Sequence, residues 1–181
     1  MKKVLTLTLS LLLVLSMLVS ITACGDSKVT GEPYDGGYYT TIIPEDLTKL
    51  AEMSGALTYA NLRNNTKVII TPNGKCEAND NGTPDYEMFD SDKFNAEHFA
   101  SQFDSATEVL SSEMITHKEY RLYEFVFHIE RFLSSSDSLY QTMYWVASDL
   151  DSDNSYEVTS IMIEETDAER PYAKAMLPVL K

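Results

Sequence analysis

The clearest pattern along the chain is a run of alternating apolar and polar side chains over residues 119–132. Its apolar members, Tyr123, Phe125, Phe127 and Ile129, lie two residues apart. Such a period of two is typical of a β-strand with one face toward a core. Weaker versions of the pattern predict strands at residues 109–116, 139–148 and 156–164. Short loops join the last three of these four strands, so they are expected to pair antiparallel.

A pair of shorter strands is predicted in the first half of the chain, at residues 56–63 and 66–71. Asn64-Asn65 lies between them. Asparagine tolerates the positive φ angles that tight hairpin turns require. The two segments are therefore expected to form a β-hairpin.

Helical spacing of apolar residues follows Pro44, which suits the first turn of a helix. Leu47, Leu50 and Ala51 would share one face, and Gly55 would mark the end. This pattern predicts a first helix immediately before the hairpin.

Two further helices are predicted. One begins at an Asn95 cap, where Phe94 and Phe99 have the spacing of a hydrophobic staple. The other covers residues 167–180, with Asp167 as cap and Pro171 in its first turn. The order helix, hairpin, helix, antiparallel meander, helix predicts an α+β fold, a twisted antiparallel sheet with helices packed on it.

A long apolar segment, residues 4–19, follows Lys2 and Lys3 near the start of the chain. A basic start, an apolar core and a small residue before a cleavage site are the marks of a secretory signal. Ile21-Thr22-Ala23-Cys24 at its end resembles the lipobox of bacterial lipoproteins. That resemblance implies cleavage before Cys24 and acylation of its thiol. A retained membrane-spanning helix and ordinary secretion are the alternatives.

This interpretation divides the chain into three parts. Residues 1–23 would be a lipoprotein signal peptide, 24–41 a lipid-anchored N-terminus and flexible tether, and 42–181 a single domain. Two acyl chains on Cys24 would anchor the protein stably to the extracytoplasmic face of a cell membrane. The lipid bilayer, reached through the acylated Cys24, is thus one expected partner.

Charge limits the other partners. The chain carries a net charge of −14, and loss of residues 1–23, which include Lys2 and Lys3, would make it −16. Such acidity repels nucleic acid and other polyanions. An unknown envelope or membrane protein is therefore the expected macromolecular partner.

Cysteine usage is simple, because the chain has only Cys24 and Cys76. If lipid occupies Cys24, Cys76 cannot form a disulfide within the chain. An incidental thiol is the favoured interpretation, and an intermolecular or redox role is the alternative.

The best candidate for a metal site is the acidic loop that carries Asp149, Asp151 and Asp153. Aspartates at this spacing resemble the first half of a calcium loop of the EF-hand type. Asn154 replaces the turn glycine, however, and Ser160 stands where a bidentate glutamate is needed. A solvated hairpin loop is therefore favoured, and no metal is predicted.

Histidines and carboxylates offer one further possibility. Glu124, His128 and Glu130 lie at two-residue spacing and would share one face of the strongest strand, where a general base could lie. A polar outer face is favoured instead. His98 and His117 belong to no recognisable motif, and no catalytic residue or cofactor is predicted.

The order of elements over residues 40–181 resembles the PsbP-like fold, which includes extrinsic photosystem proteins and bacterial lipoproteins of the LpqN type. A cystatin-like fold is the main competitor. The resemblance implies a non-catalytic accessory or adaptor domain and carries over no site residue. The sequence thus predicts a membrane-anchored lipoprotein that binds and does not catalyse. A calcium-stabilised adhesion or sensing domain and an enzyme with an unrecognised site are the alternatives.

Overall fold

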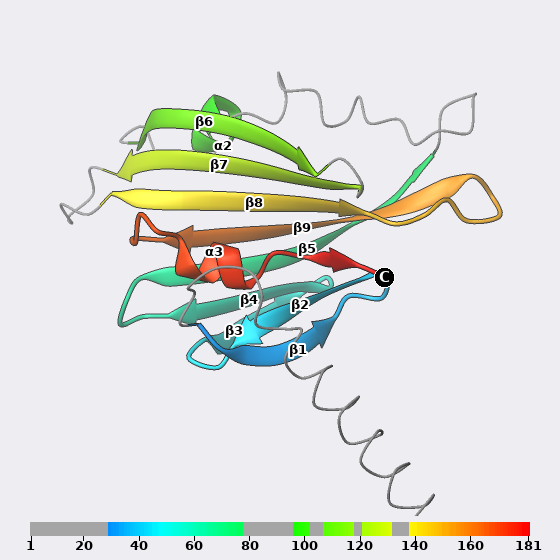
Figure 1. Cartoon of the computed structure of the whole chain (residues 1–181), viewed down its shortest axis with the longest axis horizontal. Helices are drawn as coiled ribbons and strands as arrows, with labels where there is room; N and C mark the ends of the chain where they lie inside the picture. Colours follow the sequence, from blue (N-terminus) through cyan, green and yellow to red (C-terminus); the bar gives the residue numbers. More distant parts are fainter. Residues whose placement is uncertain (1–28, 78–95, 102–106, 118–120, 132–137) are drawn as a thin grey trace, which may run out of the picture.

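The computed structural model describes residues 29–77, 96–101, 107–117, 121–131 and 138–181. Within these ranges the chain forms two antiparallel sheets and two short helices (Figure 1). The larger sheet has the strand order β3-β4-β5-β9-β8-β7-β6 and the smaller one β1-β2-β10. The strands are β1 Gly31–Asp35, β2 Tyr39–Pro44, β3 Thr48–Met53, β4 Ala56–Asn61, β5 Thr66–Glu77, β6 Thr107–His117, β7 Leu122–Arg131, β8 Leu139–Ala147, β9 Ser155–Glu165 and β10 Val179–Leu180. The helices are α2 Ala96–Ala100 and α3 Pro171–Ala175.

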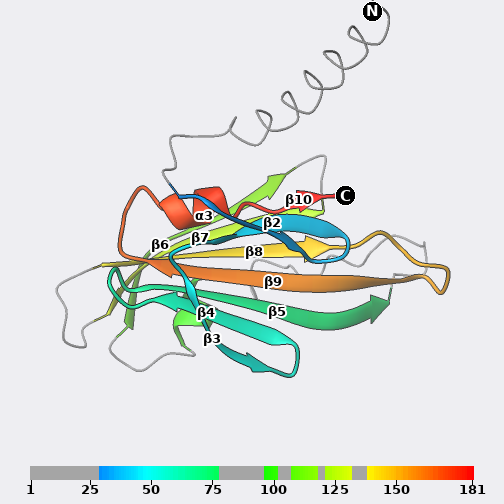
Figure 2. The ribbon, with the colours of Figure 1, turned by 90° about the horizontal axis from the view of Figure 1, so that it is seen from below.

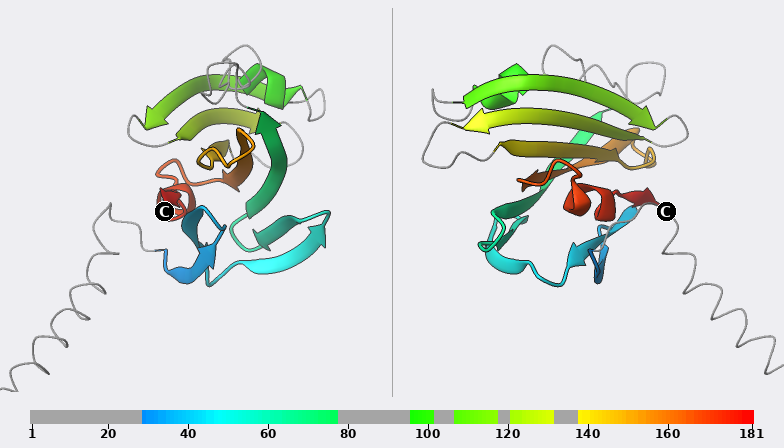
Figure 3. Two further views of the ribbon diagram at one scale, coloured as in Figure 1. Left: turned by 90° about the vertical axis from the view of Figure 1, so that its right-hand side faces the viewer. Right: turned by 60° about the vertical axis from the view of Figure 1, so that its left-hand side comes forward.

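The predicted α+β fold class is wrong, because the described chain is mostly β. Each helix has five residues, too few to cover a seven-stranded sheet. The small sheet takes the place where helices were expected. Figure 3 shows the large sheet curving around α3 and around the strands β1 and β2.

The predicted first helix is the strand β3. Ser54 and Gly55 both have positive φ angles, 51° and 83°, and they join Met53 directly to Ala56. This two-residue connection is the turn that strands of a hairpin prefer. Gly55 therefore turns a hairpin and does not end a helix.

The predicted closing helix over 167–180 is shortened to α3. Pro171 does lie in its first turn, as expected. Pro178 lacks the N–H that a continuing helix would need. Val179 and Leu180 instead pair with Thr40 and Tyr39 of β2.

Within the described residues the strand predictions are confirmed. β4 and β5 form the expected hairpin, and Asn65 in its turn has a φ of 56°. β6, β7, β8 and β9 form the expected antiparallel meander. Its last strand then pairs with β5, and Figure 2 shows these two strands running side by side. Pro72 is accommodated within β5 by a shift of register before Gly74.

The predicted tether over 24–41 is wrong for residues 31–41, which hold β1 and the start of β2. The tyrosines of this segment pack on the domain. Tyr39 is buried, and the Tyr38 hydroxyl donates a hydrogen bond of 2.8 Å to Thr159 Oγ1 of β9. Aromatic burial against the large sheet explains why this glycine-rich segment is ordered.

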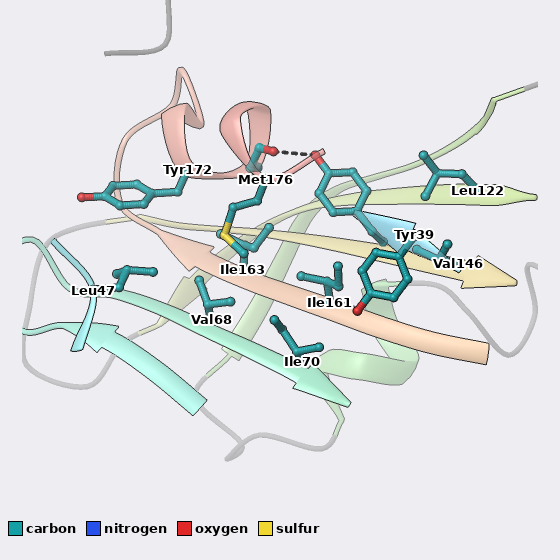
Figure 4. Close-up of a cluster of buried hydrophobic side chains, with 12 residues drawn as sticks. Tyr39, Leu47, Val68, Ile70, Leu122, Val146, Ile161, Ile163, Tyr172 and Met176 are labelled. Carbon is teal, nitrogen blue, oxygen red and sulfur yellow. Dashed lines mark hydrogen bonds between the residues drawn. The ribbon is translucent and has the colours of Figure 1, made fainter. Parts of the chain in front are cut away.

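Each face of the large sheet carries a hydrophobic cluster. On the face toward α3 and the small sheet, Val68, Ile70, Ile161 and Ile163 meet Tyr39, Leu47 and Met176 (Figure 4). On the other face, Phe125, Phe127, Trp145 and Tyr156 pack with Ala96 of α2. The strong alternation in β7 thus serves the face that α2 covers.

Candidate functional site

A half-buried ion cluster lies on the face of the large sheet that carries α3. At its centre is Glu124 of β7, with 9% of its surface exposed. His117 Nε2 lies 3.3 Å from Glu124 Oε2, and Arg170 Nη1 lies 3.4 Å from Oε1. Arg170 Nη1 also donates to Thr142 Oγ1 at 3.3 Å. β6, β7 and the loop before α3 therefore meet at one carboxylate, and β8 joins them through the contact of Thr142 with Arg170.

A tight turn before α3 places Arg170. The Asp167 side chain accepts from the Glu169 N–H at 2.9 Å, and the Asp167 carbonyl accepts from the Arg170 N–H at 3.0 Å. Arg170 adopts a left-handed conformation, with φ 50° and ψ 54°. Asp167 thus forms a turn and does not cap a long helix. A left-handed arginine costs free energy, which the contacts of its side chain offset.

The contacts of the cluster fasten the α3 loop to the sheet. One Glu124 oxygen lies beside the His117 ring and the other beside the Arg170 guanidinium. Beside it, the Tyr144 hydroxyl donates to the Ala173 carbonyl at 2.9 Å, and burial raises the pKa of Tyr144 well above its ordinary value. A carboxylate held in this way is a structural clamp between β7 and α3.

The hypothetical general-base group is not brought together. Glu124 contacts His117 and Arg170, whereas the His128 ring stacks on Tyr140 with centroids 4.3 Å apart. Glu130 lies opposite Glu108 of the neighbouring strand β6. The sequence placed Glu124 correctly on the second face of β7 but did not identify Arg170. One signal in the sequence was available: the apolar residues Leu122 and Val126 lie on the same face as Glu124, which indicates that another part of the chain covers that face.

A second buried polar pair lies on the opposite face. Gln141 is fully buried, and its Nε2 lies 3.5 Å from Glu164 Oε1. Lys67 Nζ reaches Glu164 Oε2 at 3.8 Å from the more exposed side. Lys67 thus supplies a compensating charge for a carboxylate that the sheet buries.

The acidic loop between β8 and β9 is organised by its own side chains. Asp151 accepts hydrogen bonds from the Asp153 N–H and from both the N–H and the hydroxyl of Ser155. Lys75 Nζ lies 2.8 Å from Asp151 Oδ2, and Arg121 pairs with Asp149. The hydrogen bonds from its neighbours and from Lys75 lower the pKa of Asp151 strongly. Asn154, with φ 64°, takes the position where an EF-hand has glycine.

We expect calcium to leave the melting temperature of the domain unchanged. Lys75 and Ser155 occupy the Asp151 carboxylate, and no group of three or more potential metal ligands occurs among the residues described. A ligand that binds only the native state must stabilise it. Thermal melts with calcium and with chelator test this. A melting temperature that rises with calcium concentration, and fails to rise in Asp151→Asn, would contradict the expectation.

Of the two cysteines, the structure describes only Cys76. Cys24, the predicted lipidation site, lies outside the described residues. Cys76 is half-buried on β5, opposite Tyr156, and packs against the cluster under α2. His98 is exposed on α2, where its ring meets the edge of Phe99.

Large apolar side chains are exposed around the β3–β4 end of the large sheet. Met53 is 75% exposed and Leu62 in the next turn 82% exposed. All six residues of β3 are exposed, including Leu50. The sequence did not predict this surface, because its pattern assigned the residues of β3 to a helix in which Leu50 would face a core. Among the described residues, no helix is both long and apolar enough to cross a membrane.

No family model matches the chain, and the comparison with curated proteins gives no match. Among solved structures the chain is similar to LpqN of Mycobacterium tuberculosis, described as involved in cell envelope biogenesis. Identity is 13%, the TM-score is 0.45, and the match covers 86% of this chain and 93% of that one. It is also similar to the cyanobacterial PsbP of Synechocystis sp. PCC 6803. Here identity is 15%, the TM-score is 0.42, and coverage is 88% and 98%.

A third similar structure is the Ran-binding protein Mog1p of Saccharomyces cerevisiae. Identity is 14%, the TM-score is 0.41, and the match covers 82% of this chain and 86% of that one. The similar structures therefore include an LpqN protein and a PsbP protein, the two groups that the order of elements resembles. At these identities and scores they supply no site residue and no activity for this chain.

Proposed function

We propose that this chain is a lipid-anchored extracytoplasmic protein whose β domain acts as a non-catalytic binding module for a membrane or envelope protein. The observation that carries the proposal is Ile21-Thr22-Ala23-Cys24 at the end of an apolar segment that follows two lysines. Residue types, order and spacing agree with a lipoprotein signal. Diacyl modification of Cys24 would then fix the protein to the bilayer.

The position of β1 limits how far the domain could lie from the membrane. The first strand begins at Gly31, so seven peptide units separate it from Cys24. A fully extended chain covers at most about 3.6 Å per residue, which limits the distance to about 25 Å. The β1 end of the domain would therefore lie within about 25 Å of the membrane surface. Its partners would be neighbouring membrane or envelope components.

A binding role is supported by what the ionisable side chains do. Glu124 is held by His117 and Arg170, and Asp151 by Lys75 and Ser155. These two carboxylates thus serve a loop attachment and a turn. Catalytic acids and bases instead require access to a substrate.

Cys24→Ala is expected to abolish acylation and to release unprocessed precursor or misplace the protein. Cells are labelled with a palmitate analogue and fractionated, and label and protein are measured in the membrane fraction. Cys76→Ser is the matched control, because it removes the other cysteine of the chain and should retain both. Label and membrane attachment that persist in Cys24→Ala would contradict the anchor.

The binding part of the proposal has its own readout. Crosslinking in intact cells is expected to capture membrane or envelope proteins with the wild-type chain, and to lose them with Cys24→Ala because the domain is no longer held nearby. Capture of soluble, distant proteins alone, in equal amounts from both forms, would contradict a membrane-proximal binding role.

A further inference from the structure

The strand β3 is an open edge of the large sheet. It pairs with β4 on one side, and no described strand pairs with it on the other. All six of its residues are exposed. An open edge presents a row of backbone donors and acceptors that can pair with another strand.

The sequence of β3, Thr-Lys-Leu-Ala-Glu-Met, is complementary to itself in the antiparallel direction. Its one cation, Lys49, and its one anion, Glu52, lie at equal distances from the centre of the strand. A two-fold axis through that centre places Lys49 opposite Glu52 of a second copy, and Glu52 opposite Lys49 of that copy. Opposite charges directly across a strand pair stabilise it.

The backbone keeps both charges on one face of the sheet, as such pairing requires. Lys49 lies opposite Tyr59 of β4 and Glu52 opposite Leu57, and both of these side chains pack against the same hydrophobic cluster. Lys49 and Glu52 are three residues apart, a spacing that places side chains on opposite faces of a regular strand. The register shift at Leu50 brings them to the same face. Within one chain, Lys49 Nζ and Glu52 Oε2 are 2.6 Å apart.

The exposed apolar side chains of β3 lie where a second copy would cover them. Leu50 is 55% exposed at the register shift, and with Ala51 it would lie at the two-fold axis. Met53 at the end of the strand would face Thr48 of the second copy. Isolated exposed apolar residues are common, but here they follow one unpaired strand.

The other described edges do not suit a second copy. β1 contains Pro33 between the acidic residues Glu32 and Asp35, and proline cannot donate to a ladder. β6 carries Glu108 and Glu113 with no lysine or arginine, so two copies would repel. β10 has only two residues.

We propose that two copies of this chain associate through β3, paired antiparallel about a two-fold axis, so that the two large sheets form one continuous sheet. Two reciprocal Lys49–Glu52 pairs set the register. The net charge of −14 opposes the association at long range. Pairing is therefore measured near physiological ionic strength, where charges more than about 8 Å apart are largely screened.

Charge reversal tests the register. Lys49→Glu and Glu52→Lys each place like charges opposite one another at both ends of the joint, so each should weaken dimerisation about tenfold or more. The double variant K49E/E52K restores opposite charges and should restore the dimer. Sedimentation equilibrium of the protein purified from cells in detergent gives the dimer dissociation constant.

Two variants control for net charge. Glu113→Lys on the β6 edge changes the charge as Glu52→Lys does, and Lys174→Glu on α3 changes it as Lys49→Glu does; both sites are exposed. Neither should weaken the dimer as the β3 variants do. Thermal melts should be similar throughout, because an exposed ion pair contributes little to folding. A monomeric wild type, or single reversals no weaker than the double variant, would overturn the proposal.

A second measurement does not depend on any variant. Equal amounts of unlabelled and nitrogen-15-labelled protein are mixed and treated with a carbodiimide, which joins lysine to a carboxylate only where the two are in contact. Peptides that link a light Lys49 to a heavy Glu52 are expected. Links confined to chains of one label would show only the ion pair within a single chain, and would contradict the dimer.

Discussion

Replacing Ile163 with alanine is expected to lower the free energy of unfolding by about 3–4 kcal/mol. Ile163 is fully buried on β9, opposite Val68 of β5 on one side and Thr142 of β8 on the other. The Met176 side chain points toward it from the segment after α3 (Figure 4). Alanine removes three carbon atoms at the contact between the large sheet and its cover, and the cavity cannot close without moving both.

Ile69→Ala is the matched control, because the same atoms are removed from the adjacent strand β5. Ile69 lies opposite Met162 and is half-buried. Its loss is expected to cost about 1–1.5 kcal/mol, since less apolar area returns to water. Urea unfolding followed by fluorescence reports both, because Trp145 is the single tryptophan and is buried in the sheet. Equal costs for the two variants would contradict the assignment of the faces.

Glu165→Ala is expected to cost about 3 kcal/mol. Glu165 is 1% exposed at the end of β9. Its two oxygens accept the backbone N–H groups of Tyr172, at 3.0 Å, and Ala173, at 3.1 Å. Each buried donor left without a partner costs about 1–3 kcal/mol, and alanine would leave two. Since the donors belong to the first turn of α3, loss of α3 should accompany the loss of stability.

Glu169→Ala provides the control, because Glu169 is exposed and pairs only with the surface residue Lys174 among the contacts described. It should change the free energy of unfolding by less than about 0.5 kcal/mol. Urea midpoints give both values. A cost for Glu165→Ala no greater than that of the control would show that α3 does not depend on this carboxylate.

The pH dependence of the Glu165 effect has a definite sign. Burial raises the pKa of Glu165 above its ordinary value, so its folded form favours the proton. A raised carboxyl pKa contributes stability below the unfolded pKa, and this contribution is lost as the pH rises through the folded value. Glu165→Gln carries no charge to bury. The free energy of unfolding of Glu165→Gln, relative to that of the wild type, should therefore be higher at pH 7 than at pH 4. The opposite trend would contradict a raised pKa of Glu165.

The pairing partners of the meander strands were predictable because periodicity, short loops and turn residues agree there. In β3 they conflict. Six residues with Leu50 and Ala51 fit a helical face as well as an edge strand, and only the turn at Ser54 and Gly55 decides between them. Edge strands bury little, so their pattern carries little information about which face is inside.

The ion cluster could not be predicted from spacing. Arg170 and Glu124 are 46 residues apart and meet only because β9 runs beside β8, after which the chain turns back over the sheet. The local motif before α3 signals a helix start equally well, since Asp167 and Pro171 are common in both settings. The left-handed conformation of Arg170 is stabilised by its distant partner and is therefore invisible in the local sequence.

The small sheet imposes an order on biosynthesis. β2 lies between β1 and β10, and the Thr40 hydroxyl reaches the Val179 carbonyl across 139 residues. A ribosome makes β1 and β2 well before β10, the strand that completes their sheet. Until then the hairpin has neither its third strand nor the surface on which Tyr38 and Tyr39 rest. A newly made chain therefore carries Tyr38 and Tyr39 without their final packing while the intervening strands are being made.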